Sequence, residues 1–148
     1  MYDDAMAIDV TRFEDTIFQQ VLGEPTHAVE EAVLSRQLVG ETSLHTVVER
    51  FMDLFGVGKG EALDILGVSR TKLSRNPTMS VGLLDQAGSI LKTYARVANI
   101  RGPEAAARWF TKANRHLDGK PPLALLETGL GRERLNEYVT ALEDGVFL

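Results

Sequence analysis

The chain of 148 residues contains no cysteine, and this absence excludes several kinds of structure and chemistry. Without thiols there is no disulfide framework, no thiolate zinc site and no cysteine nucleophile. No apolar run approaches the roughly 18–20 residues that a membrane-spanning helix needs. Acids stand at Asp3 and Asp4, where a secretory signal peptide would carry bases. We therefore expect a cytoplasmic protein with one compact domain or two small ones.

Signatures of catalysis and metal binding are also scarce. The three histidines, His27, His45 and His116, lie far apart in the sequence and have no partner at a metal-ligand spacing. No nucleophile elbow accompanies the serines. The glycine-rich run over residues 56–60 lacks the spacing of a Walker motif, and no predicted strand precedes it. We expect a protein that is not an enzyme and that has no metal site and no cofactor.

Charge is distributed unevenly along the chain, although the total is only −5. Residues 1–35 hold eight acids and one base, residues 36–135 hold ten acids and fifteen bases, and residues 136–148 hold three acids and no base. A basic middle between acidic ends is compatible with binding to a polyanion. A mixed solvated surface would show the same pattern.

Apolar residues recur at helical spacing almost everywhere, and the alternation typical of strands is rare. The pattern predicts an all-α fold. Helices are expected from a capping box at Thr11–Glu14 to Gly23, from Pro25 to near Gly40, from Ser43 to Gly56 and from Ser80 to Gly102. Shorter helices follow Pro103. The predicted units are acidic N-terminal helices (1–42), a central helix-turn-helix and dimerisation region (43–101) and a C-terminal domain (102–148).

The segment over residues 59–75 has the features of a helix-turn-helix. Gly67 supplies the positive φ of a tight turn, and Ser69 is a good N-cap for the second helix. Apolar residues stand where two crossed helices must pack, at Ala62, Leu66, Val68 and Leu73. The segment resembles the helix-turn-helix of Xre-type regulators, except that Leu63 occupies a position that is usually small.

The second helix of this motif presents cations and hydroxyls to a possible DNA partner. In such motifs, residues near the start of the second helix contact base edges in the major groove, and further cations contact phosphates. The predicted DNA-binding residues are Ser69, Arg70, Thr71, Lys72, Ser74 and Arg75. A helical hairpin with a solvated basic face is the alternative.

Two-fold symmetry is usual for helix-turn-helix proteins and predicts a homodimer on a roughly palindromic site. The apolar stripe between Leu83 and Ala98 is a candidate for part of the dimer seam. An ordinary core helix would have the same stripe.

Residues 105–147 resemble the toxin-binding domain of the Xre/MbcA/ParS antitoxins. The resemblance lies in the runs Ala107-Arg108-Trp109-Phe110, Asn114-Arg115-His116-Leu117, Gly119-Lys120-Pro121-Pro122-Leu123 and Leu126-Glu127-Thr128, in Gly131, and in the ending from Tyr138 to Phe147. Several of these residues can also be interpreted in structural terms. Trp109 and Phe110 are expected to anchor a core, with direct partner contact as the alternative. Asn114 should satisfy a turn, and Gly129 and Gly131 should supply backbone freedom.

The resemblance implies the antitoxin of a type II toxin–antitoxin module. Members of this family neutralise RES-domain toxins, which consume NAD or use it to ADP-ribosylate targets, and they commonly repress their own operon. The expected partners are therefore a cognate RES-domain toxin and operator DNA. A free-standing helix-turn-helix regulator without a toxin is the alternative.

The end of the chain mixes acids with aromatic and aliphatic residues, which suits a toxin pocket built for a dinucleotide diphosphate. Acids would pair with cations of that pocket, and apolar side chains would cover its base and ribose surfaces. The predicted toxin-binding residues are Tyr138, Glu143, Asp144, Val146, Phe147 and Leu148. A frayed terminus without function is the alternative.

Overall fold

The structure, a computed structural model, describes residues 13–37, 40 and 42–146. Within these ranges the protein is built of helices and contains no strand, and Ser43 and Thr78 form an isolated antiparallel bridge. The prediction of an all-α fold is confirmed. None of the helices in these ranges is long and apolar enough to cross a membrane.

The first described helix covers residues 13–22 and stops at Gly23, which has a φ of 78°. The capping box predicted to start it includes Thr11, which lies outside the described residues. Helix α2 follows over Thr26–Ser35. Its N-cap position is held by Pro25, which offers no side-chain acceptor, so Asp15 Oδ1 of the preceding helix accepts a hydrogen bond from the N–H of Thr26 at 3.1 Å.

The prediction that this second helix runs to near Gly40 is wrong, because α2 ends at Ser35. Arg36 adopts the left-handed conformation, with a φ of 58°. The N–H groups of Arg36 and Gln37 then donate to carbonyls of the last helical turn. Helices usually end this way at a glycine, but here the left-handed residue is an arginine. The sequence therefore gives no indication that the helix ends at this point.

Four helices form the middle of the chain: α3 (Leu44–Phe55), α4 (Lys59–Leu66), α5 (Arg70–Ser74) and α6 (Val81–Arg101). The hydroxyls of Ser43, Ser69 and Ser80 each accept a hydrogen bond from a backbone N–H in the first turn of α3, α5 and α6. Gly56 and Gly67 end α3 and α4 in the left-handed conformation. These predicted starts and stops are confirmed.

The C-terminal third contains α7 (Pro103–Thr111), the short 3₁₀ helix η1 (Arg115–Leu117), α8 (Pro122–Leu125) and α9 (Gly129–Glu143). A single residue, Gly102, separates α6 from α7, with φ 85° and ψ 154°. Only glycine adopts this combination readily. Pro103 then occupies the first turn of α7, where its missing N–H costs nothing.

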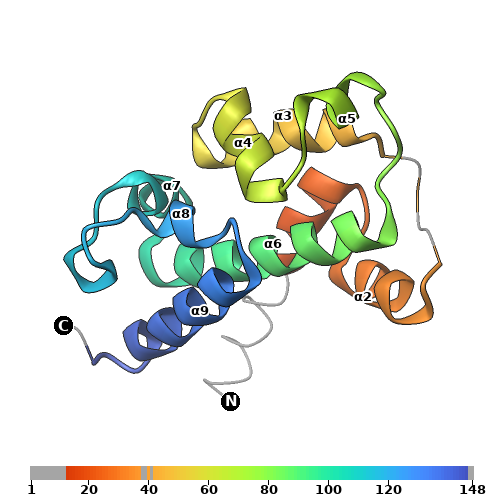
Figure 1. The fold of residues 1–148 in the computed structure, drawn as a ribbon. Coiled ribbons are helices and arrows are strands. Elements are labelled where there is room, and N and C mark those ends of the chain that lie inside the picture. The colour runs from red at the N-terminus through yellow and green to blue at the C-terminus, as the bar shows by residue number, and fades with distance from the viewer. Residues whose placement is uncertain (1–12, 38–39, 41, 147–148) are drawn as a thin grey trace, which may run out of the picture.

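Helix α6 is the centre of the fold (Figure 1). Helices α2, α7 and α9 pack along it, and α4 also contacts it, while α3, α4 and α5 form a unit on one side. In the first half of α6, Gly88 leaves room for the ring of Phe18 and for Val29, which would lie 3.5 and 3.7 Å from an added Cβ. A Cβ at this position would make ordinary van der Waals contact with both side chains, so Gly88 marks a close approach of the first helix and α2 to α6.

The buried side chains form one continuous core that extends from Ile17 to Val139. An aromatic cluster joins the central helices to the C-terminal third: the ring of Phe55 meets those of Tyr94 and Phe110 edge-on, at centroid distances of 5.5 and 5.1 Å. The division predicted between residues 101 and 102 therefore falls within a shared core.

The apolar stripe of α6 belongs to this core. Its residues are at most 7% exposed within a single chain; they are Leu83, Leu84, Ala87, Ile90, Leu91, Tyr94 and Ala98. Burial of the Tyr94 phenol raises its pKa above the usual 10.0. Because the stripe is already covered, it is not available as a dimer seam, and the alternative of an ordinary core helix is the correct one.

Candidate functional site

Helices α4 and α5, separated by Gly67, Val68 and Ser69, occupy the segment that the sequence predicts to be a helix-turn-helix. Ala62 and Leu66 of α4, at 0% and 1% exposed, and Val68 and Leu73, at 7% and 8%, are all part of the hydrophobic core. Leu63, the position that departs from the Xre pattern, is also buried, at 3%. The apolar residues of this segment are thus buried, as the predicted motif requires.

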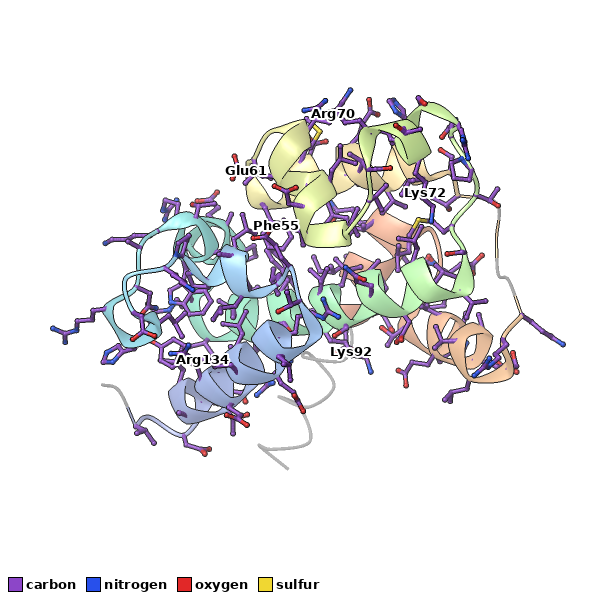
Figure 2. All side chains as sticks on the ribbon, viewed as in Figure 1. Phe55, Glu61, Arg70, Lys72, Lys92 and Arg134 are labelled. Carbon is purple, nitrogen blue, oxygen red and sulfur yellow. The ribbon has the colours of Figure 1, made fainter. Side chains whose placement is uncertain are left out.

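The face of α5 is basic and exposed. Arg70, Lys72 and Arg75 are all solvent-exposed, and over the described residues no ion pair joins any of them to an acid. Figure 2 places Arg70 at the outer edge of this unit, far from Arg134 of α9. The three cationic side chains of α5 and its C-cap are therefore available to bind a polyanion.

Two of the predicted DNA-binding hydroxyls already have partners within the motif. Ser69 Oγ accepts from the N–H of Lys72 at 3.1 Å, and Ser74 Oγ donates to the carbonyl of Thr71 at 2.7 Å. Ser69 caps the helix and Ser74 closes its last turn. The cations and the exposed Thr71 are thus the residues with side chains least engaged by the protein itself.

The C-terminal third contains an aromatic stack that lies partly at the surface. Phe110 is fully buried, which confirms its predicted role as an anchor, whereas Trp109 is half-buried. The Trp109 ring stacks on Tyr138 of α9 at a centroid distance of 6.1 Å and an angle of 14°. Asn114 joins this stack, because its Nδ2 donates to the Tyr138 hydroxyl at 3.3 Å and its Oδ1 accepts from the N–H of His116 at 2.9 Å. The prediction that Asn114 satisfies a local backbone group is confirmed.

Gly131 is required for a reason other than the predicted backbone freedom. A Cβ at this position would lie 2.3 Å from the carbonyl oxygen of Leu125 and 2.9 Å from Thr128 Oγ1. The first turn of α9 therefore touches the backbone of α8 directly. Gly129 has no such neighbour, since the nearest atom to its Cβ position is the tip of Arg132, at 3.8 Å. Neither glycine has a positive φ.

The six residues predicted to bind a toxin differ in their surroundings. Tyr138 is held in the aromatic stack, and Glu143 is paired with Arg96 of α6. Asp144 is exposed, and Val146 is 66% exposed. Phe147 and Leu148 lie outside the described residues.

Helix α9 ends in a well-formed glycine stop. Gly145 has a φ of 76°, and its N–H donates to the carbonyl of Leu142 at 3.1 Å. The N–H of Val146 donates back to the carbonyl of Ala141 at 2.9 Å. These two hydrogen bonds are those of the Schellman motif, which turns the chain off the helix in a defined direction.

Residues that the sequence did not single out connect the end of α9 to α6. Asn136 Oδ1 accepts from Thr93 Oγ1 at 2.9 Å and from Arg96 Nη1 at 3.1 Å, and Arg96 Nη2 also donates to Thr140 Oγ1 at 2.8 Å. One signal was present: polar residues recur at i, i+4 and i+7 on both helices, as Ser89, Thr93 and Arg96 and as Asn136, Thr140 and Glu143. This spacing shows that each helix has a polar face, but it does not pair the two faces.

The described residues form an all-helical protein whose C-terminal third is a small helical unit packed on α6. Comparison with protein families identifies that unit. Residues 96–145, about one third of the chain, match the antitoxin Xre/MbcA/ParS C-terminal toxin-binding domain. The recognition of the chain as an Xre/MbcA/ParS-type antitoxin is confirmed over this segment, and a toxin is its indicated partner. No curated protein matches the chain.

Proposed function

We propose that this protein neutralises a RES-domain toxin by inserting the end of its chain into the toxin's active site, and that it represses its own operon through α5. The observation that supports the first part is the toxin-binding domain over residues 96–145, which ends at the glycine stop of α9. Beyond this stop, the side chain of Val146 is 66% exposed.

Among the predicted contacts, Asp144 and Val146 fit a role in the toxin pocket best. Both lie at the end of α9 and are exposed. A carboxylate beside apolar side chains suits a pocket that binds a dinucleotide diphosphate, where cations and base-binding surfaces lie close together. The chain therefore acts by occupying an active site, without catalysis of its own.

The test of this plug is deletion of Asp144–Leu148 in cells that express the cognate toxin. We expect the truncated protein to fold but to fail to restore growth. A matched control is the pair Arg70→Ala and Arg75→Ala, which should restore growth as the unaltered protein does. Restored growth by the truncated protein would show that the toxin is blocked elsewhere.

The DNA-binding part of the proposal is supported by the exposed cations of α5, none of which has an acidic partner within the described ranges. We expect Arg70→Ala with Arg75→Ala to keep the fold and to abolish binding to the operon's own promoter in a gel-shift titration at physiological salt. Here the truncated protein is the matched control, since its α5 is intact. Unchanged promoter affinity in the double variant would show that α5 is not the helix that binds the promoter.

We further propose a cytoplasmic homodimer that binds a roughly palindromic site, as is usual for helix-turn-helix proteins. The mass of the purified protein in sedimentation equilibrium tests the dimer. Co-purification with the product of the neighbouring gene separates the antitoxin from a free-standing regulator. A regulator without a toxin would bind the promoter and capture no such product.

A further inference from the structure

Glu143 was expected to contact the toxin, but the structure places its carboxylate on a residue of its own chain. Arg96 donates to it twice, through Nε to Oε2 at 3.2 Å and through Nη2 to Oε1 at 2.6 Å. The two side chains are 28% and 36% exposed, so the pair is partly screened from water. A bidentate arginine–carboxylate pair is directional as well as strong, because both partners are planar.

The pair is one end of a larger set of hydrogen bonds between α6 and α9. The same guanidinium donates to Asn136 Oδ1 and to Thr140 Oγ1, and the buried Thr93 hydroxyl also donates to Asn136. Asn136 Nδ2 and Thr140 Oγ1 donate in turn to carbonyls of α9, at 3.0 Å each. We call these five residues, Thr93, Arg96, Asn136, Thr140 and Glu143, the α6–α9 clamp. It fixes both the tilt and the rotation of α9 on the central helix.

The clamp reaches the last turn of α9, immediately before the helix stop. Glu143 is the final residue of the helix, Asp144 follows it, and Gly145 turns the chain away. A hydrophobic contact often accompanies such a stop, yet Val146 remains 66% exposed. The clamp and the stop together therefore hold an apolar side chain in solvent at a fixed position and direction.

We propose that Arg96 and Glu143 are positioning residues for toxin neutralisation: they fix the end of α9 so that Asp144 and Val146 are already held in place when they meet the toxin's active site. Glu143 contacts Arg96 in the complex as it does in the free protein, and it leaves the contacts with the toxin to the residues after it. This inference rests on the proposed function of the terminal residues as a plug.

The energetic reason is pre-organisation. A freely moving end must lose conformational freedom when it binds, and this loss opposes binding. Loss of the clamp transfers part of this cost to the binding step. We expect Arg96→Ala and Glu143→Ala each to weaken the affinity for the cognate toxin by about tenfold, which corresponds to ~1.4 kcal/mol.

A double-mutant cycle distinguishes positioning from direct contact. If Glu143 acts only through Arg96, the double variant should also lose about tenfold, because the second substitution has nothing left to remove. Losses that multiply to about a hundredfold would show that Glu143 contacts the toxin itself and would overturn the inference. Full affinity in either single variant would overturn it as well.

The same substitutions in the chain truncated after Glu143 complete the experiment. If the truncated chain binds the toxin as tightly as the full chain, the proposed plug is wrong. If truncation weakens binding but Arg96→Ala in the full chain does not, only the clamp inference is wrong. With both correct, Arg96→Ala adds no loss to the truncated chain. Where an alanine variant has reduced helix content, Glu143→Gln replaces it, since the amide keeps the shape of the side chain and removes its charge. The affinity of Glu143→Gln for the toxin must also be lower than that of the unaltered chain.

Discussion

The contact between Gly131 and the backbone of Leu125 leads to a prediction that can be worked out from the structure. A methyl group at residue 131 would lie 2.3 Å from the Leu125 carbonyl oxygen and 3.1 Å from its carbonyl carbon. A Cβ atom essentially never lies within 3.0 Å of a heavy atom beyond its own residue and chain neighbours, so α8 and α9 must separate. The neighbouring atoms are backbone, which cannot rotate away as a side chain can.

Gly131→Ala should therefore destabilise the C-terminal third by about 1–3 kcal/mol, the usual cost of forcing an extra carbon into a packed interior. The gain in helix propensity, roughly 1 kcal/mol, offsets only part of a larger clash. Separation of the helices also weakens two hydrogen bonds that join this turn to its surroundings: the N–H of Gly131 to Thr128 Oγ1 at 3.0 Å and Arg132 Nη1 to the carbonyl of Leu126 at 2.9 Å.

The assay can use the protein's only tryptophan, Trp109, whose ring lies in the same unit on Tyr138. Urea unfolding followed by Trp109 fluorescence should show a lower midpoint for Gly131→Ala. Gly129→Ala is the matched control, because its methyl group meets only the flexible end of Arg132 at 3.8 Å. It should be neutral or stabilising by up to about 1 kcal/mol. Equal midpoints for the two variants would refute the steric argument.

Substitutions at three further positions test the links between α6 and the rest of the fold. Gly102→Ala should cost about 1–3 kcal/mol in thermal unfolding, because alanine is strained at φ 85° and ψ 154° even though the added carbon meets no atom within 4 Å. Phe110→Ala should cost about 3–5 kcal/mol by removing a fully buried ring that contacts Phe55, and Phe110→Leu should cost clearly less in the same experiment. The raised pKa of Tyr94 means that its stabilising effect is present below pH 10 and is lost as the pH rises through the folded-state value, so Tyr94→Phe should flatten the fall in stability at alkaline pH.

The sequence predicted the features of the fold that depend on local chemistry. Ser43, Ser69 and Ser80 cap their helices, and Gly56 and Gly67 end theirs, because a hydroxyl at an N-cap or a glycine at a C-cap satisfies nearby backbone groups whatever lies further away. The resemblance of the C-terminal domain to the antitoxin family could also be found from local sequence, because it lies in short motifs that follow one another in order.

Features that depend on contacts between distant residues were not predictable. Arg96 and Glu143 are 47 positions apart, and an acid near the chain end looked like a ligand for a partner. Gly131 could be recognised as unusual, but the reason, contact with the Leu125 backbone, appears only when α8 and α9 are placed together. Similarly, an apolar stripe on α6 has the same spacing whether a second chain or the same chain covers it.

Helix α6 has a consequence for how this protein can be divided. Its 21 residues extend roughly 30 Å, at about 1.5 Å per residue, and both ends of the molecule bury their apolar side chains against it. The family match begins at Arg96, within the last two turns of this helix. A fragment cut at that point would keep the recognised sequence but lose Tyr94 and Leu91 from beneath it, while the complementary fragment would lose Phe110 from its aromatic cluster. Expression of either piece alone should yield a protein with exposed core side chains. The proposed toxin-binding and DNA-binding activities are therefore better separated by point substitution than by truncation at the family boundary.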